Sequence, residues 1–330
     1  MSGQTIVAPK HAQRVAVLGA GRWGRNLVRG FGKLGVLRGI VDPEPRILDE
    51  MRSSYPDAWV SADMERAFGP GIDAVAIATP ASTHANLTLQ ALAAGKDVFV
   101  EKPLAMTSAD AGRMVGAAEA DGLVLMAGHL LLYQPAIEFL HGYLNTGSIG
   151  KVVSLHQDRL NLGTVRTAEN ALWSLGVHDI AAILHLIGED AIEVEAWGQR
   201  VLQPRIEDDV RLNMRFGGNR EAHVHASWLW PERRRRLTIV GTDAMIVYDE
   251  EDQRVVLRRC HVVSDLTVED EGSEVLFNGD PRPLKRELSH FLECVRDRTE
   301  PLSSGASAIP VVRVLEQASQ QLKVRSEGRL

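Results

Sequence analysis

The chain has 330 residues, which at roughly 150 residues per domain suggests two domains. Apolar residues make up 45% of the chain and charged residues 24%, so the composition excludes a disordered or fibrous protein. The net charge of -6 argues against a general nucleic-acid-binding protein, because such binding begins with a basic face that neutralises phosphates.

The ends of the chain and its cysteines indicate a compartment. Residues 1–12 lack the apolar core of a signal peptide, and we expect them to form a flexible N-terminal arm. No run approaches about 18 continuous apolar residues, so we expect neither a membrane-spanning helix nor a membrane partner. Cys260 and Cys294 lack the spacing of metal ligands, and we interpret them as reduced thiols. These features together predict a cytoplasmic protein.

A strand, a glycine-rich loop and a helix follow one another from residue 15. Val15–Leu18 is short, apolar and rich in β-branched residues, as a strand buried on both faces should be. The loop that follows contains Gly19, Gly21 and Gly24. The first glycine permits a tight turn, the second lets the backbone approach a diphosphate, and the third lets the helix pack on the strand. The helix N-terminus would then present free N–H groups to the phosphates.

An acidic residue ends the next predicted strand. This strand covers residues 37–41, and Asp42 follows it, 18 residues after Gly24. A carboxylate about 20 residues after the glycine loop accepts hydrogen bonds from the ribose 2′-hydroxyl and repels a 2′-phosphate. The sequence therefore favours NAD over NADP, although Arg22 and Arg46 are cations that could meet a 2′-phosphate. An ordinary turn residue is the alternative interpretation of Asp42.

Strands and helices continue to alternate through residue 127. We predict further strands at 74–78, 97–100 and 123–127, with helices at about 83–94 and 108–120. This alternation predicts a doubly wound parallel sheet, the Rossmann fold, over residues 13–127. Ligands in such sheets bind beyond the carboxyl ends of the strands. The residues that fall at those ends are Gly19 to Gly24, Asp42, Thr79, Pro80 and Glu101 to Pro103.

The pattern changes from about residue 128. Helices are predicted near 135–144 and 175–187, and strands at 151–160, 192–201, 209–216, 220–228, 237–241 and 244–248. Several strands alternate apolar and polar residues, as half-exposed antiparallel strands do. His223 and His225 share one face of a strand, but the sequence suggests no acid or third ligand nearby, so we predict no metal site.

Four consecutive arginines, Arg233 to Arg236, are a local exception to the acidic balance. We interpret them as a solvated turn and strand entry after Pro231. The alternative is that they form part of a groove for an anionic substrate.

Several segments carry a family resemblance. The stretches from Ala78 to His84 and from Ala91 to Val98, with Glu101-Lys102-Pro103, resemble the Gfo/Idh/MocA oxidoreductase family. The segment from Pro283 to Leu292, with Pro301, is similar to the family's C-terminal pattern. The resemblance covers nearly the whole chain. It implies a Rossmann domain joined to an α/β domain with an open, mostly antiparallel sheet, here residues 128–330, for substrate binding and oligomerisation.

The resemblance also implies functional residues in the first domain. In the family, the lysine at the position of Lys102 contacts the reacting hydroxyl and the nicotinamide ribose. The residues that we expect to bind the NAD cofactor are Gly19, Gly21, Arg22, Trp23, Gly24, Asp42, Thr79, Pro80, His84, Glu101 and Lys102.

A histidine in the second domain is the candidate base. In the family pattern an acid precedes the histidine by four residues; here the histidine is His178 and the acid's position holds Ser174. Removing a hydride from a carbinol carbon requires the hydroxyl to lose its proton, and a histidine that titrates near neutrality suits that task. We therefore expect His178 to act as general base while Lys102 stabilises the developing alkoxide. A satisfied buried histidine is the alternative, and Asp179 is expected to orient the ring or to cap the helix.

Polar side chains that gather just before this histidine resemble the nucleotide-sugar branch of the family, which includes UDP-N-acetylglucosamine 3-dehydrogenases. On this resemblance, Arg159 and Arg166 would bind a diphosphate as planar forks, and Asn161 and Asn170 would meet sugar hydroxyls or the acetamido group. The expected substrate-binding residues are Tyr133, Arg159, Asn161, Arg166, Asn170, Trp173 and Asp179. A solvated loop between strand and helix is the alternative.

The function that we expect is NAD-dependent oxidation of the sugar 3-hydroxyl of UDP-N-acetylglucosamine, in the synthesis of 3-amino sugars for lipopolysaccharide precursors. The alternative substrates are UDP-N-acetylglucosaminuronate, inositol or a free aldose. A different class is a redox-inert NAD-binding regulator, which would need neither Lys102 nor His178. Because NAD oxidises a secondary alcohol uphill near neutral pH, a downstream aminotransferase is an expected partner, and the resemblance implies a homodimer or homotetramer.

Overall fold

The computed structural model describes residues 13–279 and 282–327, so the predicted arm at residues 1–12 lies outside the described residues. The chain divides into two compact units. The first contains residues 13–105, Gly112–Gly128 and Lys285–Gly305. The second contains Met106–Ala111, the described part of His129–Leu284, and residues 306–327.

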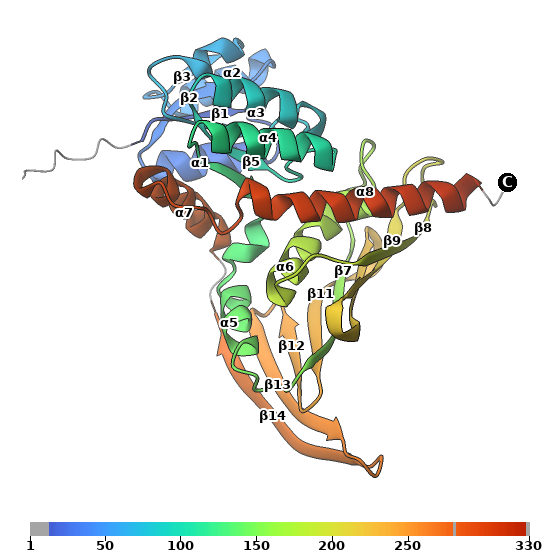
Figure 1. Cartoon of the computed structure of the whole chain (residues 1–330). Coiled ribbons are helices and arrows are strands. Elements are labelled where there is room, and N and C mark those ends of the chain that lie inside the picture. Colours follow the sequence, from blue (N-terminus) through green and yellow to red (C-terminus); the bar gives the residue numbers. More distant parts are fainter. Residues whose placement is uncertain (1–12, 280–281, 328–330) are drawn as a thin grey trace, which may run out of the picture. The chain divides into compact units, whose positions relative to one another are not determined.

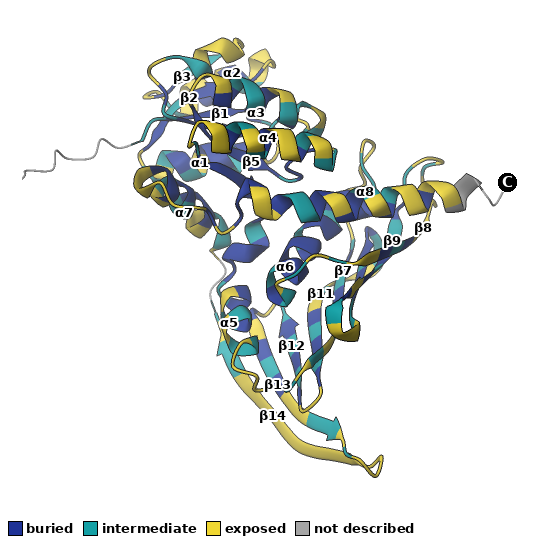
Figure 2. Cartoon of the chain, viewed as in Figure 1, coloured by how far each residue is buried: buried dark blue, intermediate teal, exposed yellow. Residues whose placement is uncertain are grey.

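A six-stranded parallel sheet forms the centre of the first unit (Figure 1). Its order is β3-β2-β1-β4-β5-β6, so the strand order reverses between β1 and β4, where α/β sheets bind ligands. Every residue of β1, β4 and β5 is buried, which explains their continuous apolar runs (Figure 2). The strands are β1 (Val15–Leu18), β2 (Leu37–Val41), β3 (Trp59–Ser61), β4 (Ala74–Ile77), β5 (Asp97–Glu101) and β6 (Leu125–Gly128). This sheet confirms the predicted Rossmann fold.

Helices connect these strands. They are α1 (Gly24–Lys33), α2 (Pro45–Ser54), α3 (His84–Ala93) and α4 (Ser108–Ala120), with short 3-10 turns at η1 (Met64–Phe68) and η2 (Ala81–Thr83). Helices α3 and α4 lie within two residues of their predicted ends. Helix α2 and the three-residue strand β3 were not predicted, because the apolar pattern of each is short.

The chain returns to the first unit late, with α7 (Pro283–Asp297). Phe291 of α7 contacts Phe31 and Phe99 edge to face, with ring centroids 6.5 and 5.8 Å apart. Such aromatic contacts and the burial of Leu288 add apolar area to the core. The segment Lys285–Gly305 therefore belongs to the first unit, whereas the division predicted from sequence assigned it to the second domain.

An eight-stranded mixed sheet forms the second unit, in the order β14-β13-β12-β11-β7-β10-β9-β8 (Figure 1). Neighbours are antiparallel except β7 and β10, which are parallel, and this confirms the predicted open, mostly antiparallel sheet. The strands are β7 (Val152–Leu162), β8 (Glu193–Gln199), β9 (Asp209–Phe216), β10 (Arg220–Ser227), β11 (Leu229–Gly241), β12 (Met245–Asp249), β13 (Arg254–Val262) and β14 (Val268–Asn278).

Helices accompany this sheet, and α6 contacts β7 and β10. The helices and short turns are α5 (Pro135–Leu144), α6 (Val177–Ile187), α8 (Gly305–Glu327), η3 (Leu130–Tyr133), η4 (Leu172–Gly176) and η5 (Gly217–Asn219). No helix in the described ranges is both long and apolar enough to cross a membrane.

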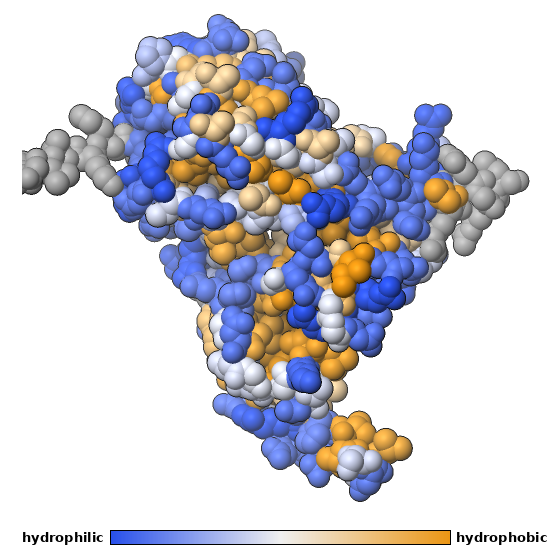
Figure 3. Space-filling model, viewed as in Figure 1, coloured by the Kyte–Doolittle hydropathy of each residue, from blue (hydrophilic) through white to orange (hydrophobic). Residues whose placement is uncertain are grey.

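Two features of this sheet differ from the prediction. Strand β11 begins at Leu229, eight residues before the predicted start, and a register shift between Leu229 and Arg234 accommodates Pro231. The hairpin of β13 and β14 was not predicted. Its tip exposes three apolar side chains, Val262, Leu266 and Val268. Figure 3 shows an apolar area at this tip of the hairpin.

Candidate functional site

The glycine-rich loop leaves β1 and enters α1. Gly19 has a φ of +86°, and a Cβ there would lie 2.7 Å from the carbonyl oxygen of Ala78. A Cβ on Gly24 would overlap the carbonyl oxygen of Gly19, whereas open space surrounds the position of a Cβ on Gly21. The loop is therefore closely packed at Gly19 and Gly24 and open at Gly21. That opening at a helix N-terminus fits the diphosphate of a dinucleotide.

Asp42 is buried directly after β2, at the same edge of the sheet. Its carboxylate accepts hydrogen bonds from the backbone N–H groups of Ala20, at 2.8 Å, and Glu44, at 2.9 Å. The carboxylate therefore fixes the glycine loop to the strand end. Because each carboxylate oxygen has further lone pairs, these bonds are compatible with the ribose contact predicted from sequence.

Glu101 ends β5 and is buried. Its Oε1 accepts a hydrogen bond from the indole Nε1 of Trp23, and its Oε2 accepts one from the backbone N–H of Lys102 at 3.2 Å. Burial raises the pKa of Glu101 to about 7, while the Trp23 bond and the charge of Lys102 act in the opposite direction. Lys102 is half-buried and precedes a cis peptide bond to Pro103.

A second buried carboxyl interacts with Glu101. Glu287 of α7 is 1% exposed, and neither of its oxygens has a hydrogen-bond partner among the described residues. Burial raises the pKa of Glu287 well above its usual range, and the charge of Glu101 raises it further. Glu287 was not predicted from the sequence, although it lies in the late segment that resembles the family's C-terminal pattern.

His84 does not face outward from the strand edge. Its Nδ1 lies 2.8 Å from the carbonyl oxygen of Pro103, and its Nε2 lies 3.0 Å from that of Thr79. The buried ring therefore ties the turn after β4 to the turn after β5. Both ring nitrogens face backbone oxygens, and a contact of His84 with the cofactor stays a prediction. At the same edge Thr79 is half-buried, while Arg22 and Pro80 are exposed.

In the second unit, His178 is the second residue of α6 and is half-buried. It follows η4, a π-helical turn of five residues. Such turns are rare and occur frequently at functional sites. Ser174, which holds the position of the family acid, is buried within this turn.

Arg159 of β7 lies in a buried network of ion pairs. It donates three hydrogen bonds of 2.7 to 2.9 Å to Asp179, and a fourth, of 2.7 Å, to Glu250. Arg159 is 4% exposed and Asp179 is 0% exposed. Burial raises the pKa of Asp179, and the charge and hydrogen bonds of Arg159 act in the opposite direction. Arg159 and Asp179 are therefore engaged with each other, and their contacts with substrate stay a prediction.

Two more predicted substrate residues are engaged within the protein. The side chain of Asn170 donates to Glu207 at 3.0 Å and accepts from the backbone N–H of Trp173 at 3.2 Å. The indole of Trp173 is buried and donates to Ser319 of α8 at 2.9 Å. Both residues therefore hold the turn before α6 in place, and their contacts with substrate stay a prediction.

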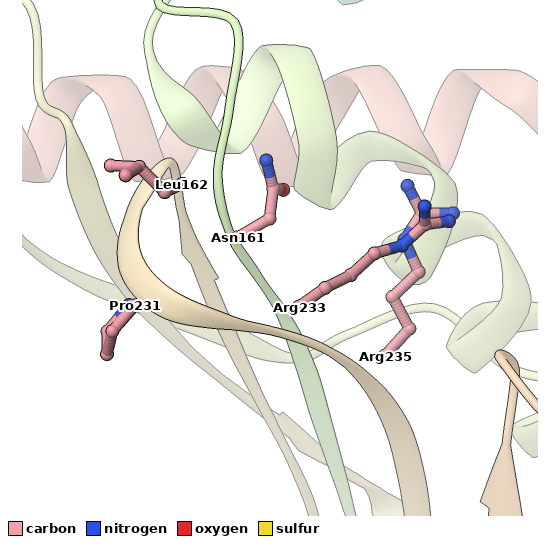
Figure 4. A pocket seen from close by; sticks show the side chains of 5 residues that line it. All are labelled: Asn161, Leu162, Pro231, Arg233 and Arg235. Carbon is pink, nitrogen blue, oxygen red and sulfur yellow. The ribbon is translucent and has the colours of Figure 1, made fainter.

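The remaining predicted substrate residues have different surroundings. Tyr133 is buried in η3. The Arg166 side chain is 43% exposed and lies 3.8 Å from Glu169. Asn161 lines an open hollow of about 370 Å³ in the second unit (Figure 4). The other lining residues are Leu162, Pro231, Arg233 and Arg235.

Strand pairing gives the histidines of β10 neighbours that the sequence did not suggest. His225 Nε2 lies 2.9 Å from Asp209 of β9, and His223 stacks on His156 of β7 with ring centroids 4.7 Å apart. Within the described ranges, no group of three or more His, Cys, Asp or Glu side chains is arranged to hold a metal ion.

Family models match most of the chain. Residues 13–129 match a model described as "Oxidoreductase family, NAD-binding Rossmann fold". Residues 139–247 match the "GFO/IDH/MocA C-terminal domain".

Individual proteins are similar along much of their length. The scyllo-inositol 2-dehydrogenase (NAD(+)) of Bacillus subtilis strain 168 is 27% identical over 318 residues, which cover 91% of each chain. The UDP-N-acetylglucosamine 3-dehydrogenase of Acidithiobacillus ferrooxidans is 28% identical over 232 residues, which cover 70% of this chain and 72% of that one. Its solved structure matches with a TM-score of 0.84 and 23% identity, covering 95% of this chain and 98% of that one. An Agrobacterium radiobacter oxidoreductase, solved with NAD+, L-tartaric acid and magnesium, matches with a TM-score of 0.81 and 20% identity, covering 97% and 100%.

Proposed function

The chain belongs to the Gfo/Idh/MocA oxidoreductase family, and we propose that it uses NAD to oxidise the 3-hydroxyl of UDP-N-acetylglucosamine. It is an oxidoreductase of a family that acts on sugars, and its first domain is an NAD-binding Rossmann fold. The choice of sugar rests on the 28% identity to the Acidithiobacillus ferrooxidans enzyme.

The observation that carries the dehydrogenase proposal is the position of Lys102. It follows β5 at the edge where β1 ends in the glycine loop and β2 ends at Asp42. A redox-inert regulator would need the loop and Asp42 but no cationic side chain at that edge. The presence of Lys102 together with the glycine loop and Asp42 therefore supports an enzyme over a redox-inert regulator.

The proposed chemistry assigns one task to each side chain. NAD, when bound, supplies the acceptor for the hydride that leaves the carbinol carbon. Lys102 donates a hydrogen bond to the substrate oxygen, and its charge stabilises the alkoxide. The neutral imidazole of His178 takes the hydroxyl proton, so the alcohol loses a hydride and a proton and becomes a ketone. Glu101 and His84 position the segment that carries Lys102.

An alternative substrate is a cyclitol such as inositol, which the similarity to the Bacillus subtilis enzyme over 91% of both chains supports. We also propose that the protein is a homodimer or homotetramer, because the tip of the β13–β14 hairpin exposes Val262, Leu266 and Val268. An aminotransferase that consumes the ketone would draw the oxidation forward.

Nicotinamide absorbance tests the proposal. Purified protein with NAD and a carbonyl trap should form NADH with UDP-N-acetylglucosamine, and more slowly or not at all with UDP-N-acetylglucosaminuronate, myo-inositol or a free aldose. Turnover of myo-inositol alone would replace the proposed substrate.

His178→Asn should lower kcat by about 10²–10⁴-fold and leave the Kd for NAD nearly unchanged, because only proton transfer is lost. A variant with unchanged kcat would remove His178 from the mechanism.

A further inference from the structure

The hollow in the second unit contains side-chain donors that the protein itself does not use. Arg233 bonds to Glu251 through Nε at 2.7 Å, and Arg235 bonds to Glu250 through Nη1 at 2.9 Å. Within the part of the chain that the structure describes, neither terminal nitrogen of Arg233, nor Nη2 of Arg235, makes a hydrogen bond. The amide of Asn161 likewise makes none there, and it lines the same hollow (Figure 4).

The side chains of the four consecutive arginines alternate between the two faces of β11, so only two of them face the hollow. Successive side chains of a strand point to opposite faces, so Arg233 and Arg235 project to one face of β11. Arg234 and Arg236 project to the other, where they pair with Asp158 at 3.0 Å and Asp249 at 3.3 Å. The run is therefore divided into two arginines in the hollow and two in surface ion pairs.

The two guanidinium groups in the hollow converge. The Nε atoms of Arg233 and Arg235 lie 2.7 and 3.7 Å from the same oxygen of Glu251. Glu251 accepts a hydrogen bond from Nε of Arg233 and Glu250 accepts one from Nη1 of Arg235, which leaves the terminal nitrogens of Arg233 and Nη2 of Arg235 for a ligand. Nε of Arg235 is buried and has no hydrogen-bond partner among the described residues. Planar guanidinium groups match the oxygens of phosphate groups.

Ion pairs connect the hollow to the helix that carries the candidate base. Arg235 shares Glu250 with Arg159, and Arg159 bonds to Asp179, the neighbour of His178 in sequence. Arg235 and Arg159 are also paired across β11 and β7, so both lie on the face of the sheet that α6 contacts. A ligand held by Arg233 and Arg235 therefore lies on the same face of the sheet as α6, the helix that carries His178.

We propose that this hollow binds the diphosphate of a nucleotide-sugar substrate, with Arg233, Arg235 and Asn161 as its donors. This inference rests on the proposed dehydrogenase function and specifies its substrate class. A neutral cyclitol or free aldose has no anionic group to place between two guanidinium forks. The diphosphate task that the sequence analysis gave to Arg159 and Arg166 passes to Arg233 and Arg235.

The local charges determine how this site recognises an anion. Three cations, Arg159, Arg233 and Arg235, are balanced by the carboxylates of Asp179, Glu250 and Glu251. Attraction therefore comes from the direction of the N–H donors and not from an excess of positive charge. A lysine at position 233 would keep the charge but lose the planar fork, so charge alone should not restore binding.

Calorimetric titration of the full-length protein with UDP, in the presence of NAD, tests the proposal. Arg233→Ala should weaken UDP binding at least tenfold, because it removes a charge-assisted pair of hydrogen bonds, and Arg233→Lys should recover little of the loss. Arg234→Ala is the matched control: that side chain is 48% exposed against 58% for Arg233, but it lies on the other face. Asn161→Ala should give a smaller loss than Arg233→Ala. Unfolding temperatures check that each variant is folded.

The outcomes separate this inference from the proposed function. Equal UDP affinity for wild type, Arg233→Ala and Asn161→Ala, or an equal loss in Arg234→Ala, would overturn the diphosphate site. If such a protein still reduced NAD with a polyol, the dehydrogenase function would stand without the site. Conversely, UDP binding that depends on Arg233, with no turnover of any sugar, would support the site and overturn the dehydrogenase proposal.

Discussion

Arg159 is a buried cation that pairs with two carboxylates of the protein itself. All four of its hydrogen bonds go to Asp179 and Glu250, which lie on α6 and beside β12. Burying a charged group is costly unless it is paired and hydrogen-bonded. The network therefore fixes the start of α6, the helix that carries His178.

Replacing Arg159 should consequently destabilise the protein. Arg159→Met leaves the carboxylates of Asp179 and Glu250 uncompensated, and we expect a loss of about 3–5 kcal/mol in the free energy of unfolding. Arg166→Met, at an exposed position in the loop that follows β7, should change it by less than about 0.5 kcal/mol. Urea denaturation measures both. Equal stabilities would show that the buried network does not hold α6.

Single-residue predictions succeeded where a local pattern sets the environment. Asp42 and Lys102 each follow a buried strand, so their place at the sheet edge could be predicted from the sequence. The commitment of Arg159 could not, because Glu250 is 91 residues away in the chain and nothing near either residue indicates the other. A strand arginine near a candidate base has the same local sequence whether it binds substrate or a distant carboxylate.

At the scale of elements, the loop between β1 and α1 contains closely packed glycines and one glycine with open space around it. Gly24 is packed against the carbonyl of Gly19, whereas Gly21 faces open space. The sequence motif assigns a task to each glycine, and the structure shows which of them the fold itself requires.

Alanine substitutions distinguish these tasks. Gly21→Ala should leave the unfolding temperature without cofactor nearly unchanged but weaken the Kd for NAD about tenfold or more, because the methyl group occupies the space of the diphosphate. Gly24→Ala should lower the unfolding temperature itself, since its Cβ has no room. Unchanged NAD affinity in Gly21→Ala would place the diphosphate elsewhere.

Elements with a clear hydrophobic period were predicted well, and others were missed for physical reasons. The start of β11 was not predicted because Pro231 and four consecutive arginines are unusual in a strand. In the structure they lie beside a register shift in the pairing of β11 with β7. Strand β14 is almost entirely exposed, so it has no apolar alternation to reveal it. Helix α7 is amphipathic, but nothing in its sequence indicates that it packs on the first unit.

For the molecule as a whole, the interacting pair Glu101 and Glu287 links stability to pH. Both pKa values are raised in the folded protein, that of Glu101 to about 7. The folded state therefore retains protons that the unfolded chain releases above its ordinary value of 4.5. Folding stability must then fall as pH rises from that value to about 7.

Glu287→Gln should weaken this dependence. The amide stays neutral, so the unfolding temperature of the variant should match wild type near pH 4 and exceed it by roughly 2–8 °C at pH 8. Glu293→Gln, at an exposed position on the same helix, serves as the control and should follow wild type. Scanning calorimetry across this range measures the effect, and parallel curves for all three proteins would contradict it.

Transfer of deuterium tests the central claim most directly. UDP-N-acetylglucosamine carrying deuterium at carbon 3 is incubated with the protein, NAD and a carbonyl trap, and the reduced nicotinamide is analysed by mass spectrometry. We predict that the deuterium appears in the nicotinamide ring and that Lys102→Met and His178→Asn each strongly slow its transfer. Reduced nicotinamide without deuterium, or no reduction while NAD and UDP-N-acetylglucosamine are both bound, would contradict oxidation of the 3-hydroxyl.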